Sequence, residues 1–312
     1  MSSTIEKALK RQEEARRKQA EAAAKQGEET LPQSADAVEP AENNTSALKK
    51  AEKRAEPAKS KSADNKTPFN IDFSRLEANG MVSLTNARTQ INEEYREIKR
   101  KLLGNAFGPL AKTLHNSNII MVTSGRPSEG KTFTAVNLAL SIAAEQDKTV
   151  LLVDADVLKP NVLNTFGLER RAGLMEYLTG DVDDISDVLY HTNVDKLKVI
   201  PAGRSHHLST ELLASQKMHD TIDEFANRYR DRVVIIDTPP LIGITESAVL
   251  ANFAGQAVIV TEEGKSKLTD IRYSIQRLNP NMAIGFVVNK SVFTDTEGTG
   301  YYGYYYAERQ EA

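Results

Sequence analysis

The sequence predicts an α/β protein built on a doubly wound, mostly parallel sheet. Short apolar runs alternate with helical patterns along most of the chain, and parallel strands need such crossover helices. One run leads directly into a glycine-rich phosphate-loop pattern that opens the next helix. The 312 residues carry 43 acidic and 40 basic side chains and no cysteine, which excludes disulfide scaffolds, thiolate metal sites and a strongly basic nucleic-acid surface. No apolar run has the length of a membrane span or a secretory signal, so we expect a cytoplasmic protein.

Residues 1–67 are expected to form an arm and linker outside the folded domain. They contain no Phe, Tyr or Trp and are rich in Ala, Glu, Lys, Gln, Ser and Pro, so they cannot bury enough apolar area to offset chain entropy. Ser3 and Glu6 form a capping-box pattern at the start of a helical run to about Lys25. This run is either a solvated helix of marginal stability or a helix that docks on a partner. The remainder of the arm is predicted to be disordered.

The folded domain is expected over residues 68–292. Its first helix is predicted over 86–103, where Ile91, Tyr95 and Ile98 recur at three- and four-residue steps. The predicted strands are Ile119–Thr123, Thr149–Asp154, Leu197–Pro201, Val233–Asp237, Gln256–Thr261 and Ala283–Asn289. Each is so continuously apolar that both of its faces should be covered. The predicted helices between them are Thr132–Glu145, Asp183–Tyr190, Lys217–Arg230, Thr245–Asn252 and Leu268–Leu278.

The strongest local pattern is G-x-x-x-x-G-K-T, which runs from Gly125 to Thr132 between a predicted strand and a predicted helix. Glycines let successive backbone N–H groups face one anion, and the helix adds its positive end. Lys131 is expected to reach the outer phosphates of ATP and the Thr132 hydroxyl to ligate Mg²⁺. The expected nucleotide-binding residues are Gly125, Arg126, Ser128, Glu129, Gly130, Lys131, Thr132 and Phe133. Arg126 either stabilises charge on the transferred group or is only a phosphate-adjacent charge.

Aspartates follow two predicted strands. Asp154 and Asp156 end one strand, and Asp237 ends another. A buried apolar strand that ends in Asp is unusual unless the charge meets a cation or N–H donors. Ligands of open α/β sheets bind at these strand ends, so the three acids are candidates for catalysis and for the magnesium site. The alternatives are a helix cap for Asp237 and a simple turn for the other two. Together with the loop, they predict a nucleotide triphosphatase or a kinase that uses ATP and Mg²⁺.

Residues 293–312 are expected to form a flexible tail rich in tyrosine. Five of the chain's ten tyrosines fall within six positions, at Tyr301, Tyr302, Tyr304, Tyr305 and Tyr306. Interspersed glycines weaken a strand interpretation, which is the alternative together with a stacking role. Phenols beside an ATP site are better explained as phosphate acceptors. Since tyrosine has an ordinary pKa of about 10, a base must take its proton during attack, and Asp154 or Asp156 is the available group.

With these motifs together, the chain resembles the bacterial tyrosine kinases (BY-kinases) of the exopolysaccharide-synthesis type over residues 86–312. The resemblance implies three nucleotide motifs, Gly125–Thr132, Val150–Asp156 and Val233–Asp237. It places Lys131, Asp154, Asp156 and Asp237 in catalysis, Thr132, Asp154 and Asp237 in the metal shell, and Asp156 as proton acceptor. It also implies that Asn289 contacts adenine, although a strand-end cap is the alternative. Leu158 stands where the family usually has Arg. Either the neighbouring Lys159 substitutes for that Arg, or the positive charge is dispensable.

The same resemblance implies an assembly and partners. A family helix with the pattern E-x-x-R-x-x-R helps to form a ring, and Glu93, Arg96 and Lys99 fit it except that Lys replaces the last Arg. We therefore expect a ring-forming homo-oligomer. An activating chain-length determinant, also called a polysaccharide co-polymerase, is expected to recruit it to the inner face of the plasma membrane. A protein-tyrosine phosphatase is expected to reverse its phosphorylation.

Two other functions compete with a tyrosine kinase. One is a nucleotide-switched ATPase of the division-site or partition type, which shares the fold class but lacks the tyrosine tail. The other is an assembly protein whose tyrosines only make contacts. His206 and His207 are metal-ligating residue types, but adjacent imidazoles on a loop seldom converge on one ion, so we expect a surface loop there.

Overall fold

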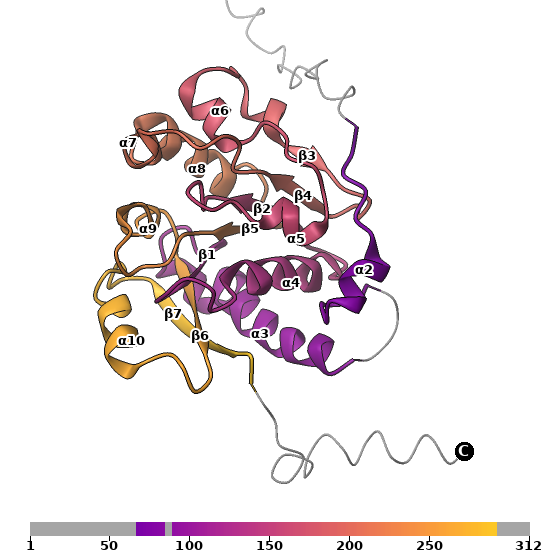
Figure 1. The fold of residues 1–312 in the computed structure, drawn as a ribbon, viewed down its shortest axis with the longest axis vertical. Helices are drawn as coiled ribbons and strands as arrows, with labels where there is room; N and C mark the ends of the chain where they lie inside the picture. Colours follow the sequence, from indigo (N-terminus) through magenta and orange to yellow (C-terminus); the bar gives the residue numbers. More distant parts are fainter. Residues whose placement is uncertain (1–66, 85–88, 292–312) are drawn as a thin grey trace, which may run out of the picture. The chain divides into compact units, whose positions relative to one another are not determined.

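A seven-stranded sheet organises the described residues, in the strand order β3-β4-β2-β5-β1-β6-β7 (Figure 1). The structure is a computed structural model and describes residues 67–84 and 89–291. The strands are β1 (Ile119–Ser124), β2 (Thr149–Asp154), β3 (Tyr190–His191), β4 (Leu197–Ile200), β5 (Arg232–Asp237), β6 (Gln256–Glu262) and β7 (Ala283–Asn289). Every neighbouring pair is parallel except β3 with β4, which confirms the predicted mostly parallel sheet.

Helices cover both faces of this sheet, as a doubly wound topology requires. They are α2 (Phe73–Ala78), α3 (Gln90–Phe107), α4 (Lys131–Ala143), α5 (Val162–Phe166), α6 (Leu174–Thr179), α7 (Ser209–Leu213), α8 (Gln216–Asn227), α9 (Thr245–Leu250) and α10 (Leu268–Ile275), with 3-10 turns η1 (Pro109–Lys112) and η2 (Ile185–Val188). One apolar core joins α3, α4 and α5 to the sheet, and a second joins α6, α8 and α9 to its other face.

The register of the sheet places the functional strand ends beside each other. Asp154 at the end of β2 pairs with Asp237 at the end of β5, and Val122 of β1 also pairs with Asp237. β1 lies next to β5 and continues into the loop before α4. The central helix α4 is buried on nearly all sides, so its first turn is held rigidly beside these strand ends.

One predicted helix was wrong. The predicted helix Asp183–Tyr190 is a 3-10 turn followed by the edge strand β3. Asp184 accepts a hydrogen bond from the Ser186 backbone N at 2.7 Å, which closes a single turn, and Tyr190 then packs on Phe69 at a ring distance of 4.8 Å. A local cap and a long-range aromatic contact therefore override the apparent helical pattern.

The strand β7 differs from its prediction in burial and not in position. We expected both of its faces to be covered, but it is the last strand of the sheet, with Phe286 48% and Val288 61% exposed. The short helices α2, α5, α6 and α7 were not predicted, because each is too short to show a periodic pattern. Two predicted segments lie outside the described residues: the arm, except for its last residue 67, and the tail 293–312. The domain boundaries therefore stay predictions.

Candidate functional site

The loop between β1 and α4 has the backbone shape of a phosphate cradle. Ser128 and Gly130 both lie in the left-handed region, at φ 69° and 101°. A Cβ atom at Gly130 would come within 1.9 Å of the Asn289 side-chain nitrogen, so only glycine fits there. The loop ends at the first turn of α4, where unpaired N–H groups and the helix dipole favour an anion.

Glu129 holds this loop in shape from the inside. Its buried carboxylate accepts hydrogen bonds from the Arg126 backbone N at 2.7 Å and from the Ser266 hydroxyl. Its carbonyl oxygen accepts a hydrogen bond from Asn289 Nδ2 at 2.9 Å. Glu129 was predicted to bind the nucleotide; the structure engages its side chain in bracing the loop that is expected to do so.

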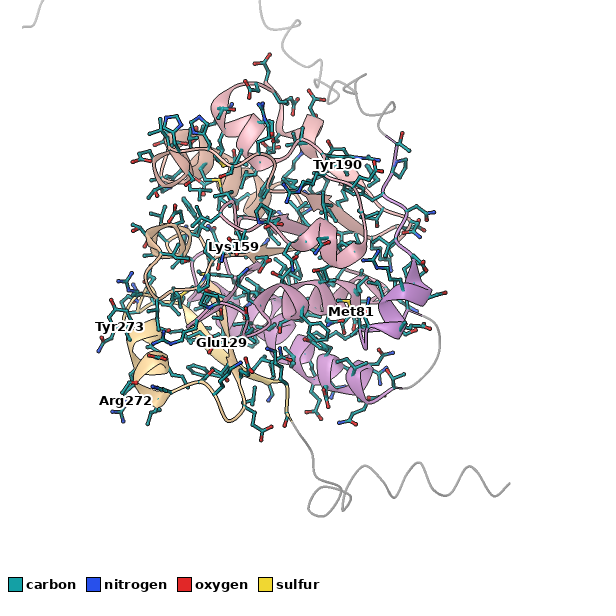
Figure 2. All side chains as sticks on the ribbon, in the orientation of Figure 1. Met81, Glu129, Lys159, Tyr190, Arg272 and Tyr273 are labelled. Atoms are coloured by element: carbon teal, nitrogen blue, oxygen red, sulfur yellow. The ribbon has the colours of Figure 1, made fainter. Side chains whose placement is uncertain are left out.

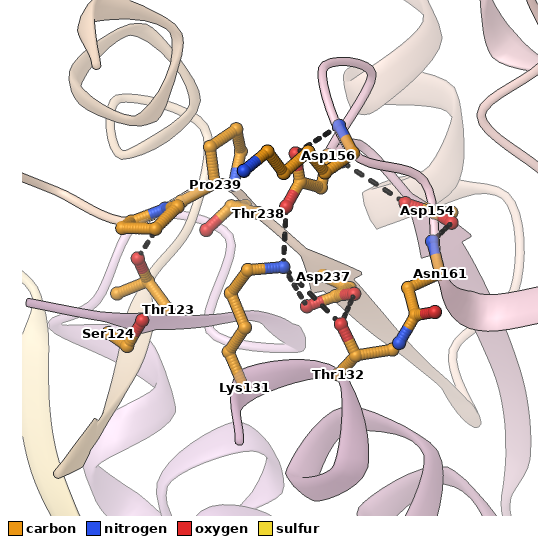
Figure 3. A network of polar contacts seen from close by, with 12 residues as sticks. Thr123, Ser124, Lys131, Thr132, Asp154, Asp156, Asn161, Asp237, Thr238 and Pro239 are labelled. Atoms are coloured by element: carbon orange, nitrogen blue, oxygen red, sulfur yellow. Dashed lines mark hydrogen bonds and ion pairs between the residues drawn. The ribbon is translucent and has the colours of Figure 1, made fainter. Parts of the chain in front are cut away.

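Lys131 and Thr132 meet the strand-end carboxylates in one buried network (Figure 3). Lys131 Nζ lies 2.6 Å from Asp156 Oδ2 and 3.6 Å from Asp237 Oδ1. The Thr132 hydroxyl donates to Asp237 Oδ2 at 2.7 Å. Three motifs far apart in sequence are thus brought together.

Asp154 is held by backbone groups and not by the lysine. Its Oδ2 accepts from the N–H groups of Asn161 and Val162, each at 3.1 Å, and its Oδ1 accepts from Asp156 N at 3.2 Å. These donors fix the carboxylate at the end of β2 beside Asp237.

Negative charge in this cluster is under-compensated. Burial, and after it the charge of the Asp237 carboxylate, raise the pKa of Asp154 to about 8. Burial also raises the pKa of Asp237 to about 6, although Lys131 opposes this. Burial disfavours the charge on Lys131, but Asp237 and Asp156 outweigh it and leave the pKa of the ammonium raised. An added cation would therefore be stabilised here.

These residues fit a nucleotide-bound Mg²⁺. Asp237 Oδ1 is buried and makes no hydrogen bond, which leaves an oxygen ready for a cation. Among the described residues, no group of three or more Asp, Glu or His side chains could hold a metal by itself. Mg²⁺ takes one or two carboxylates together with substrate phosphates and water.

The raised pKa of Asp154 predicts how stability depends on pH. The folded state binds this proton more tightly than the unfolded chain, so the contribution to stability is complete below about pH 4 and is lost as pH rises through about 8. With a chelator present to remove divalent metal ions, the free energy of unfolding should fall as the pH rises from 6 to 8, by at most about 1.4 kcal/mol per pH unit. Asp154→Asn should flatten this slope in denaturant titrations, whereas exposed Asp195→Asn should not. Parallel pH profiles for wild type and Asp154→Asn would contradict the assignment.

The side chain of Arg126 lies outside the network. It makes a two-pronged ion pair with Asp270 on α10, at 2.6 and 3.1 Å. Phe133 is partly buried and packs against the core, so only its backbone can face the loop. Lys159 (Figure 2) donates its backbone N–H to Asp156 Oδ1 at 3.0 Å, and its side chain is exposed.

The predicted assembly residues divide into two groups. Glu93 and Arg96 form an ion pair on the surface of α3. Lys99 is buried: its Nζ donates to the Ser141 carbonyl at 2.9 Å and pairs with Glu145 at 2.6 Å. It anchors α3 to the end of α4, so its ammonium group is already engaged within the described part of the chain, and its role in a ring stays a prediction.

Several supporting residues were missed from the sequence. Asn161, Ser266 and Asp270 hold Asp154, Glu129 and Arg126 respectively. They lie in segments with no motif, and only their contacts across the fold reveal them. The tyrosines at 301–306 lie outside the described residues. No helix in the described part of the chain is long and apolar enough to cross a membrane.

Comparisons with known proteins place this site in a family. A family model described as an AAA domain matches residues 117–282. The chain is 30% identical over 232 residues to tyrosine-protein kinase YwqD of Bacillus subtilis, covering 74% of this chain and 93% of that protein. It is 36% identical over 193 residues to the putative tyrosine-protein kinase EpsB of Ralstonia nicotianae, covering 61% of this chain and 25% of that protein. The chain therefore spans about a quarter of the length of that relative.

A solved structure agrees in fold. The kinase domain of Escherichia coli tyrosine kinase ETK matches with a TM-score of 0.61 and 29% identity, over 75% of this chain and 85% of that chain. The family model covers more than half of this chain, and the alignment with YwqD covers nearly all of that kinase. The family predicted from the motifs is confirmed, and the chain belongs to the bacterial tyrosine-protein kinases built on a P-loop AAA-type domain.

Proposed function

We propose that the protein is a tyrosine autokinase that transfers the terminal phosphoryl group of Mg-ATP to tyrosines of a neighbouring copy. The observation that carries this proposal is the convergence of Lys131 and Thr132 with Asp154, Asp156 and Asp237 at one edge of the sheet. Phosphoryl transfer asks a protein mainly for positioning and for neutralisation of charge, and these groups supply both.

The site residues have separate roles in this proposal. Backbone N–H groups of the loop and the Lys131 ammonium bind the phosphates. Thr132, Asp237 and Asp154 would hold Mg²⁺, which when bound neutralises charge on the phosphates. Asn289, which braces the loop through the Glu129 carbonyl, would also contact adenine. The side chain of Arg126 stays with Asp270 and so contributes no charge to the transferred group.

Asp156 is the proposed proton acceptor. Its carboxylate pairs with Lys131 in this structure, at 2.6 Å. When Lys131 turns to bind the phosphates, Asp156 loses that partner and becomes free to accept the phenol proton. Asp154 stays fixed by the backbone N–H groups of the Asp154–Val162 turn, which suits a metal ligand better than a group that must move.

The proposed acceptors are Tyr301, Tyr302, Tyr304, Tyr305 and Tyr306. Changing all five to Phe should abolish phosphotyrosine formation with Mg-ATP and leave the binding of ATP within about two-fold, because Phe keeps the ring and removes only the hydroxyl. The measurement is a phosphotyrosine blot beside a nucleotide-binding titration. ATP hydrolysis without any tyrosine label in the wild type would favour the nucleotide-switched ATPase instead. If wild type shows neither activity, an assembly protein is the better account.

The proposal extends to the wider role of the kinase. We infer that phosphorylation regulates the chain length or export of an exopolysaccharide, as the resemblance to bacterial tyrosine kinases of the exopolysaccharide-synthesis type implies. An activating membrane co-polymerase would recruit the protein to the inner face of the plasma membrane, and a protein-tyrosine phosphatase would reverse the modification. The exposed Glu93–Arg96 pair on α3 is the part of the predicted ring contact that remains available to a second copy.

A further inference from the structure

A pocket of about 180 Å³ lies at the opposite end of the sheet from the phosphate loop. Two of its lining residues are Lys198, near the start of β4, and Arg232, the first residue of β5. Asp237 ends the same strand, so roughly 16 Å of extended chain separates the two places. Both β4 and α8, which contribute to the pocket, lie in the upper part of Figure 1. The pocket is separate from the candidate nucleotide site.

Positive charge exceeds negative charge in this pocket. Lys198, Arg228 and Arg232 line it, against a single carboxylate, Glu224, which is paired with Arg228. In the part of the chain that the structure describes, neither Lys198 nor Arg232 forms an ion pair. Arg232 is nevertheless buried. A buried cation without a carboxylate partner is unusual in a folded protein.

The two unpaired cations also disfavour each other. Burial lowers the pKa of Lys198, and the Arg232 guanidinium lowers it further. Burial likewise lowers the pKa of Arg232, which the attraction of Tyr229 and Asp231 offsets only in part. The Asp231 carboxylate is itself engaged by the Thr149 hydroxyl at 3.0 Å. An anion bound between Lys198 and Arg232 would relieve this repulsion.

Much of the remaining wall is aromatic and apolar, and the polar residues Ser186 and His191 complete it. The Arg232 guanidinium carbon lies 4.0 Å from the centre of the Tyr229 ring, and that of Arg228 lies 5.7 Å from it. Ile185, Leu189 and Phe225 line the pocket as well. A ligand that suits such walls has a flat apolar body and an anionic end.

We propose that this pocket binds a phosphorylated tyrosine, with its ring against the apolar walls and its phosphate between Lys198 and Arg232. The natural source would be the phosphorylated 301–306 segment of a neighbouring copy, so the origin of the ligand rests on the proposed function. The pocket then recognises the product of the reaction at the other end of the sheet, and links phosphorylation to contacts between copies.

The test uses a synthetic peptide, so it does not depend on the kinase activity. The full chain carrying Lys131→Met, which removes turnover, is saturated with ADP and titrated with a peptide of residues 297–308 that bears phosphate on Tyr304. We expect this peptide to bind at least ten-fold more tightly than its unphosphorylated form and than inorganic phosphate. Lys198→Gln and Arg232→Gln should each weaken binding about ten-fold. Arg272→Gln, which removes an exposed cation on α10 (Figure 2), should leave it unchanged.

Arg232 is buried, so its variant must first show a wild-type circular dichroism spectrum and melting transition. Lys198 is only partly buried, and Lys198→Gln keeps the test valid if Arg232→Gln does not fold. Equal binding of the two peptides, equal binding of inorganic phosphate, or binding that survives both substitutions in folded protein would overturn the proposal. Binding of the phosphopeptide, together with a wild-type chain that forms no phosphotyrosine with Mg-ATP, would support the pocket and refute only the proposed source of its ligand.

Discussion

Lys131→Met should abolish autophosphorylation, with a loss of at least about 10³-fold in rate. The Lys131 ammonium is the cation closest to the strand-end acids, 2.6 Å from Asp156 and 3.6 Å from Asp237, and it is the group placed to reach the outer phosphates. Met has a similar volume and no charge, so the substitution removes electrostatics more than packing. Labelling with radioactive ATP and a nucleotide-binding titration measure the effect.

Loss of activity must be separated from loss of folding. Removal of one member of a buried charged cluster can cost about 3–5 kcal/mol. The circular dichroism spectrum and the unfolding free energy of the variant should therefore accompany the assay. Lys148→Met is the matched control, because Lys148 is also mostly covered and pairs with an aspartate, Asp147, but follows the far end of α4. It should keep full labelling; an equal loss in both variants would contradict a specific role for Lys131.

Gly130→Ala should also produce a large effect, through the backbone and not through charge. An alanine there must adopt φ 101° and place its Cβ 1.9 Å from Asn289 Nδ2, so the loop or Asn289 has to move. Asn289 then loses its hydrogen bond to the Glu129 carbonyl. We expect ATP binding to weaken at least ten-fold and the free energy of unfolding to fall by about 2–4 kcal/mol.

Gly180 also has a positive φ, so it serves as a control that separates the effect of backbone strain from that of the contact with Asn289. Gly180 has φ 85°, but a Cβ there meets nothing within 4 Å. Gly180→Ala should therefore cost only about 1 kcal/mol and leave ATP binding unchanged. Combining Asn289→Ala with Gly130→Ala should cost less ATP affinity than the sum of the two single changes, as a non-additive double-mutant cycle. If the Gly130 and Gly180 variants lose equal affinity, contact with Asn289 is not the cause.

The sequence predicted those parts of the molecule whose signals are local. Continuous apolar runs located β1, β2 and β5, and the spacing from Gly125 to Thr132 located the phosphate loop, because one strand, one turn and one helix suffice to define each pattern. The placement of Asp154 and Asp237 at the ligand-binding edge followed from the rule that open α/β sheets bind ligands at the carboxyl ends of their strands; that the two residues pair is known only from the structure.

Features that depend on contacts between residues far apart in the sequence could not be predicted from local patterns. Lys99 fits a surface pattern by spacing, yet it is buried against the carbonyl of Ser141, a contact set by how α3 packs on α4. Arg126 fits a phosphate-binding role by position, but Asp270, 144 residues further along the chain, holds its side chain. Tyr190 lies in an edge strand and not in the predicted helix, where its ring packs against that of Phe69, a distant residue in the sequence.

The most direct test of the central claim is a mixing experiment between two inactive chains. One carries Lys131→Met with all tail tyrosines intact; the other keeps Lys131 but has Phe at all five tail positions. With Mg-ATP, neither alone should gain phosphate, whereas the mixture should gain phosphate on the tail of the Lys131→Met chain, as seen by intact mass and peptide mapping. A mixture in which that tail stays unmodified, while wild-type protein is labelled in parallel, would contradict transfer from this site to a neighbouring copy.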